Sequence, residues 1–142
     1  MNNHHNSTGY IVAQGWILMF LVLVCIFLTE FATSVIQDDL SVFKSREGEN
    51  GLKVMVLLML LHAFVPMLVC ALNASWFRWM VVGITGVLAG VMLVHEVVHL
   101  VTGTKPFGIF HLLDFAHHGL GIWVTFIAIR WAKETQPVWA LA

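Results

Sequence analysis

The chain has 142 residues, of which 59% are apolar and only 11% are charged, and its mean hydropathy is +0.86. Soluble domains carry about a quarter charged residues, so this composition excludes an ordinary soluble globule and a disordered chain. Seven Lys and Arg against eight Asp and Glu leave no basic surface for phosphates, which excludes a nucleic-acid-binding protein. The two cysteines, Cys25 and Cys70, lie inside apolar runs, so no disulfide framework is expected. The composition predicts a small integral membrane protein.

Four apolar runs are long enough to cross a bilayer, which takes about 20 residues in a helix. They cover residues 10–36, about 53–72, about 79–101 and about 107–129. No alternation typical of a β-barrel is visible, and only helices or closed barrels satisfy their backbone hydrogen bonds in lipid. The sequence therefore predicts an all-α fold, a single four-helix transmembrane bundle over residues 1–142. The last two links are short, which makes the helices that they join antiparallel neighbours.

The charges and aromatic residues outside these runs bear on topology. Four of the seven Lys and Arg lie on the side of the first and third links, which favours both termini outside, with a bacterial inner membrane as the expected location. No Lys or Arg precedes the first run, so that helix is expected to be retained and not cleaved as a signal peptide. Aromatic side chains toward the side of the termini are expected to form an interfacial belt. They are Tyr10, Trp16, Trp76, Trp79, Trp131 and Trp139.

Ionisable side chains occur inside the apolar runs, where an unpaired charge costs about 2.5–3.5 kcal/mol. Three are the carboxylates Glu30, Glu96 and Asp114, and no Lys or Arg lies at their depth. Six histidines lie in or at the ends of the second, third and fourth runs: His62, His95, His99, His111, His117 and His118. At about 1.5 Å per helical residue, all these groups fall in the half of the membrane nearer the first and third links. Such a layer predicts a functional site in which histidines or a bound cation compensate the acids.

Helical spacing places several of these groups on shared faces. His95 and His99 are four residues apart, and Glu96 and His99 are three apart. In the fourth run the same spacings join His111, Asp114 and His118 in one stripe, and Asp114 with His117. Pro66 follows His62 by four residues and cannot donate to the His62 carbonyl, so a kink is expected there.

Small residues in the third and fourth runs also suggest specific packing. Gly83, Gly86 and Gly90 form a stripe that is expected to mediate close contact between helices. Gly119 and Gly121 follow the two adjacent histidines, and they either pack against a helix or leave space for a planar cofactor.

One hypothesis for the polar layer is a transition-metal site. Ferritin-like di-iron bundles use Glu from two helices and Glu-x-x-His from the other two, and this chain has a similar pattern. We expect His95, His99, His118 and Asp114 as ligands, with Glu96, Glu30 and His62 as further ligands or as groups that orient a ligating histidine. His117 and His111 are alternates. The mixed nitrogen and oxygen set suits iron or copper, with zinc also compatible.

A second hypothesis is a b-type haem, which needs two imidazoles on facing helices that point into the bundle. His62 with His117 or His118, or His95 with one of that pair, lie at similar depth and are the candidate axial ligands. In either case the expected function is that of a small redox subunit or accessory of a larger membrane oxidoreductase or monooxygenase complex. The expected partners are the lipid bilayer, other membrane subunits and a quinone or small apolar substrate.

Three further interpretations stay open. His95-Glu-Val-Val-His99 matches H-E-x-x-H, in which two histidines bind zinc and the glutamate is a general base. This segment resembles intramembrane zinc metalloproteases over five residues, and the resemblance implies a third ligand such as Asp114. Chains of Asp, Glu and His also carry protons or cations through membranes. Finally, the polar groups can hold helices together in a subunit without any cofactor.

Overall fold

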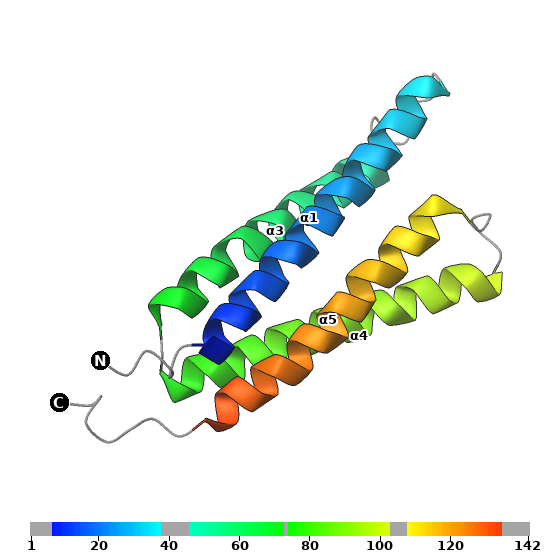
Figure 1. Ribbon diagram of the computed structural model, residues 1–142. Coiled ribbons are helices and arrows are strands. Elements are labelled where there is room, and N and C mark those ends of the chain that lie inside the picture. The colour runs from blue at the N-terminus through cyan, green and yellow to red at the C-terminus, as the bar shows by residue number, and fades with distance from the viewer. Residues whose placement is uncertain (1–6, 38–45, 73, 103–107, 135–142) are drawn as a thin grey trace.

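The computed structural model describes residues 7–37, 46–72, 74–102 and 108–134, which form four helices and no strand in these ranges (Figure 1). The helices are α1 (Ser7–Ile36), α3 (Arg46–Ala71), α4 (Ser75–Thr102) and α5 (Ile109–Lys133). All four are long and apolar enough to cross a membrane. The predicted all-α transmembrane bundle is confirmed, and the chain is an integral membrane protein by the length and composition of its helices.

The helices extend beyond the apolar runs because hydropathy marks the lipid-spanning part and not the helix ends. α3 begins at Arg46, although the sequence placed residues 46–52 in a loop. Lys53 and Glu49, four residues apart on this added turn, form an exposed ion pair of 2.6 Å. α3 also runs through Pro66 as one helix. Most of the first link and of the third link lies outside the described residues.

Each helix packs mainly against its antiparallel neighbours. α1 contacts both α3 and α5, and α5 also contacts α4. The prediction from the short links is confirmed for α4 and α5 but is wrong for α3 and α4, which do not form a packed pair because α1 and α5 make the contact between the two halves. At the end where α1 begins, Thr8 Oγ1 donates a hydrogen bond to Glu134 Oε1 just after α5 (2.5 Å). Gly15 lets α1 approach α5 closely, because a Cβ at this position would lie 2.3 Å from Val124 Cγ2.

The glycine stripe of α4 does not behave as the sequence predicted. A Cβ at Gly83 or Gly90 would meet nothing within 4 Å, and one at Gly86 would make only an ordinary contact with Thr125. The close contact between α4 and α5 is instead made by Gly121, whose Cβ would lie 3.2 Å from Ala89 Cβ. Gly121 therefore packs against a helix.

The main cluster of buried apolar side chains occupies the half of the bundle near the start of α1, and Leu23 and Ile26 are buried further along α1. The buried residues of the main cluster are Val12, Ala13, Trp16, Met19, Val65, Val69, Phe77, Val81, Val124, Ala128 and Trp131. Two members of the predicted aromatic belt, Trp16 and Trp131, are thus core residues and not interfacial anchors, whereas Tyr10, Trp76 and Trp79 are exposed as expected. Trp139 lies outside the described residues.

A buried arginine closes this packed end. Arg78 Nη1 donates to the carbonyl oxygens of Trp131 (2.8 Å) and of the C-cap residue Glu134 (3.0 Å). The Trp131 carbonyl also accepts the backbone N–H of Glu134 (3.2 Å), so Arg78 reinforces the C-terminal cap of α5. Its guanidinium carbon also lies 5.2 Å from the centre of the Trp131 ring, a cation–π distance. Toward the other end, the pair α1 and α3 diverges from the pair α4 and α5 (Figure 1).

Candidate functional site

The polar layer divides into three groups in the structure. We call Trp16, His62, His117 and His118 the central cluster, because ring contacts join them across α1, α3 and α5. We call Glu96 and His111 the carboxylate–imidazole pair, which joins α4 to α5. We call His95 and His99, both on α4, the outer histidine pair.

The central cluster lies just beyond the apolar core. The side chains of His62, His117 and His118 are 2%, 3% and 4% exposed, and Trp16 is fully buried. The ring centres of His62 and His117 are 5.5 Å apart, those of Trp16 and His62 are 4.9 Å apart, and those of His117 and His118 are 5.9 Å apart. Three helices therefore deliver imidazole and indole rings to one buried cluster, in which His62 contacts Trp16 and His117, and His118 contacts His117.

Hydrogen bonding at the central cluster is incomplete. His62 Nε2, His117 Nε2, His118 Nδ1 and Trp16 Nε1 are buried and have no hydrogen-bond partner. His62 Nδ1 lies 2.7 Å from the Leu58 carbonyl oxygen on its own helix. A carbonyl only accepts, so His62 Nδ1 carries the proton and Nε2 presents a lone pair in the neutral ring. This is the tautomer and orientation in which metal-binding histidines are held.

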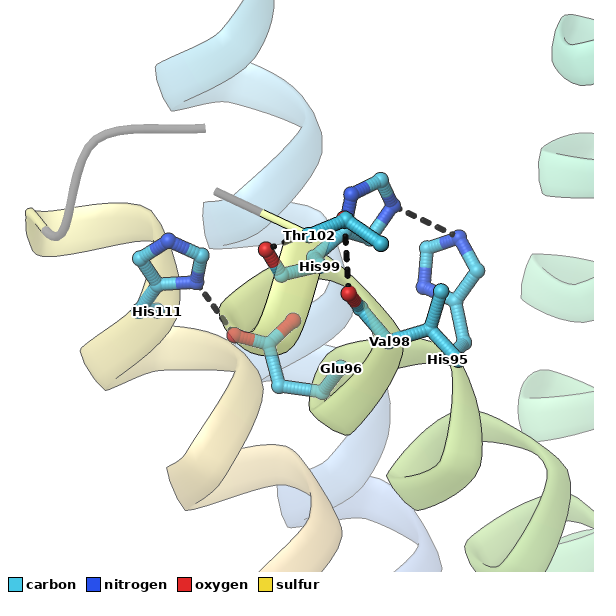
Figure 2. Close-up of polar contacts among 6 residues, drawn as sticks. All are labelled: His95, Glu96, Val98, His99, Thr102 and His111. Atoms are coloured by element: carbon cyan, nitrogen blue, oxygen red, sulfur yellow. Dashed lines mark hydrogen bonds and ion pairs between the residues drawn. The ribbon is translucent and has the colours of Figure 1, made fainter. Parts of the chain in front are cut away.

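The carboxylate–imidazole pair is also buried, with both side chains almost fully covered. His111 Nδ1 donates to Glu96 Oε1 if the carboxylate is ionised, since an ionised carboxylate only accepts. Figure 2 shows Glu96 turned toward His111 on α5. The pair therefore explains how a membrane span can hold one of its acids: a histidine on the neighbouring helix supplies the partner.

The outer histidine pair lies on another flank of α4 (Figure 2). His95 Nε2 and His99 Nε2 are 3.1 Å apart, and their ring centres are 4.4 Å apart. His95 is exposed and His99 is half-buried. The side chains of His95 and Glu96 both lie within electrostatic range of His118. The outer histidine pair, the carboxylate–imidazole pair and the central cluster are therefore neighbours.

The structure therefore divides the predicted residues among separate groups and does not bring them together in a single site. Glu30 and Asp114 are half-buried and belong to none of the three groups. In the described part of the chain, no three His, Cys, Asp or Glu side chains lie close enough to hold one metal ion. In the H-E-x-x-H segment, Glu96 binds His111 and does not lie against the two histidines as a general base would (Figure 2).

Trp16 is the member of the central cluster that the sequence did not indicate. Its position near one end of an apolar run is typical of an interfacial anchor, and only the packing of α1 against α3 places it beside His62. Comparison with protein-family models, with curated proteins and with solved structures gave no match. The chemistry of the site must therefore be inferred from its own geometry.

Proposed function

We propose that this integral membrane protein binds a redox-active transition metal, copper or iron, at the central cluster. The observation that carries the proposal is the set of buried imidazole nitrogens of His62, His117 and His118 without hydrogen-bond partners. A buried polar group left unsatisfied costs about 1–3 kcal/mol. Three such atoms in one cluster are a large cost for pure helix packing. A metal ion that accepts the lone pairs of two of these rings, His62 and His117, with water as a further ligand, lowers that cost.

Ring separation favours a metal ion over a haem between His62 and His117. With metal–nitrogen bonds of about 2.0–2.1 Å, two imidazoles on opposite sides of an ion have ring centres about 6.4 Å apart, and at a tetrahedral angle about 5.2 Å apart. The observed 5.5 Å is close to the second value. A bis-histidine haem needs ring centres about 6.4 Å apart, with the macrocycle between the two rings. The helices α3 and α5 would therefore have to separate to admit a haem.

The charge of the site favours a copper ion in its monovalent state. The histidines of the central cluster bring no negative charge, and Glu96 is engaged by His111. The cost of burying an ion grows with the square of its charge, so a monovalent ion costs about a quarter of what a divalent ion does. Imidazole ligands suit copper and iron, and copper is the one of these two that has a monovalent state in proteins.

We further propose that the protein acts as an electron-transfer subunit or accessory of a larger membrane oxidoreductase, in a bacterial inner membrane with both termini outside. The described residues are almost all helical, which leaves little chain with which to bind a soluble redox partner. Large apolar side chains on every helix are exposed and are available to lipid or to other membrane subunits.

The test is metal binding by the purified full-length protein in lipid nanodiscs. A His4→Ala/His5→Ala background removes the two histidines of the N-terminal segment, which could bind metal on their own. With His99→Ala added, so that the outer histidine pair contributes no signal, we expect this background to bind Cu(I) at the central cluster and to give a Cu(II) electron paramagnetic resonance signal after oxidation. We expect that signal to be lost in His62→Leu.

Histidine 111 offers a matched control, because it is another buried imidazole of the same layer but has a carboxylate partner. We expect His111→Leu to retain the signal that His62→Leu loses. Equal metal binding by His62→Leu and the background would overturn the proposal. A Soret band in protein expressed with haem would replace the metal ion by a haem.

A further inference from the structure

The outer histidine pair has a geometry that the central cluster does not share. Its two Nε2 atoms are 3.1 Å apart. Two nitrogens bound to one ion at about 2.0–2.1 Å lie about 2.9 Å apart at a right angle and about 3.4 Å apart at a tetrahedral angle. The observed separation falls between these values, so an ion can replace the proton that the two nitrogens now share without moving either ring far.

The position of the pair gives an ion access from water. α4 has 28 residues and is therefore about 42 Å long, whereas the hydrocarbon core of a bilayer is about 30 Å thick. If the span is centred, about 6 Å of helix emerges on each side. His99 and His95 lie three and seven residues before the last residue of α4, about 5 and 10 Å from its end. The pair thus begins at the membrane boundary.

Exposure distinguishes the pair from the buried groups. His95 is exposed within a candidate membrane span, although an imidazole gains nothing from contact with lipid. A bound ion needs more than two donors, and water can supply the rest at the exposed side of His95.

We propose that His95 and His99 form a second metal site, for a divalent transition-metal ion such as Cu(II) or Zn(II), separate from the central cluster. The two histidines bind the ion through Nε2, and water completes its coordination. In the metal-free pair one Nε2 carries the hydrogen that the other accepts. When both Nε2 atoms of the neutral rings bind the ion, that hydrogen moves to Nδ1 of its own ring, with no net release of a proton. The proposal does not depend on the central cluster, which takes its ligands from other helices.

The experiment is titration with Cu(II) alone, in nanodiscs, on the His4→Ala/His5→Ala background. We expect His99→Ala to weaken Cu(II) binding at this site by at least about tenfold. The matched control is His99→Ala/Leu100→His, which keeps the number of histidines but moves one imidazole from four to five residues after His95. That shift turns it by about 100° around the helix, so the control should bind as weakly as His99→Ala.

The outcomes separate the two proposals. His62→Leu should leave the outer site intact, with nitrogen hyperfine structure from two imidazoles in its Cu(II) resonance spectrum. Unchanged Cu(II) affinity in His99→Ala, or full recovery in the Leu100→His control, would show that the pair only shares a hydrogen bond and would overturn this inference. Loss of metal in His62→Leu, with no effect of His99→Ala, would leave the central site standing alone.

Discussion

Replacing Gly15 by alanine tests whether α1 and α5 are as close as the structure places them. The new Cβ would lie 2.3 Å from Val124 Cγ2 and 3.2 Å from Trp123 Cζ3. Carbon atoms pack at about 3.5–4.0 Å, so the helices must separate by about 1 Å or more at this point. Val124 is fully buried and has no free space to enter. Overpacking of this kind costs about 1–3 kcal/mol, and we expect Gly15→Ala to fall at the upper end.

A double-mutant cycle isolates the clash. Val124→Ala alone should cost about 1–2 kcal/mol through lost packing, but it also removes the methyl group that the Gly15→Ala Cβ would strike. The loss in free energy of unfolding of the double variant should therefore be smaller than the sum of the two single losses by about 2 kcal/mol. The assay is reversible unfolding in mixed detergent and dodecyl sulfate micelles, followed by far-ultraviolet circular dichroism.

Gly83→Ala is the matched control, since it makes the same chemical change where nothing lies within 4 Å. It should change the free energy of unfolding by no more than about 0.5 kcal/mol. Equal effects of Gly15→Ala and Gly83→Ala, or strict additivity in the cycle, would refute the close approach of α1 to α5.

Three further predictions concern the polar groups. Arg78→Met should lower the free energy of unfolding by about 1.5–3 kcal/mol, measured in the same micelles, because it removes a charged donor from two carbonyls at the end of α5; an unchanged stability would contradict this capping role. Glu96→Leu should lower the free energy of unfolding by about 1–3 kcal/mol, because it removes the acceptor of His111. Glu96→Leu/His111→Phe should be more stable than Glu96→Leu, since it replaces both partners. The reverse order would argue against a buried pair. Copper at 100 times its dissociation constant should stabilise the His99→Ala protein by about 2.7 kcal/mol, and addition of His62→Leu should abolish this effect in thermal unfolding, whereas persistence would place the bound ion elsewhere.

The number and approximate position of the helices could be predicted from sequence because the bilayer imposes a length on each apolar run. The prediction was wrong at the start of α3, where residues 46–52 are helical although polar. A charged turn such as the one that carries Glu49 and Lys53 extends a helix into water without any hydropathy signal. α4 likewise begins four residues before the apolar run 79–101, and α5 ends four residues after the run 107–129.

The composition of the polar layer could be predicted, but its pairing could not. Sequence spacing suggested Glu96 with His99, three residues later, whereas the structure pairs Glu96 with His111 on α5. Spacing along one helix identifies residues on a common face, but it does not say which neighbouring helix covers that face. The same limit explains Trp16: its contact with His62 depends on the order in which the helices are arranged around α1.

Because the main apolar cluster lies at one end of the bundle, the pair α1 and α3 and the pair α4 and α5 form two arms that are joined at that end (Figure 1). α1 extends for 10 residues past Ile26, its last buried side chain, to Ile36, a lever of about 15 Å. A change of about 10° in the angle between the two arms would move their tips by about 3 Å relative to each other. Because His62 on α3 and His117 on α5 connect the two arms, a small change in their separation is magnified at the tips of the arms.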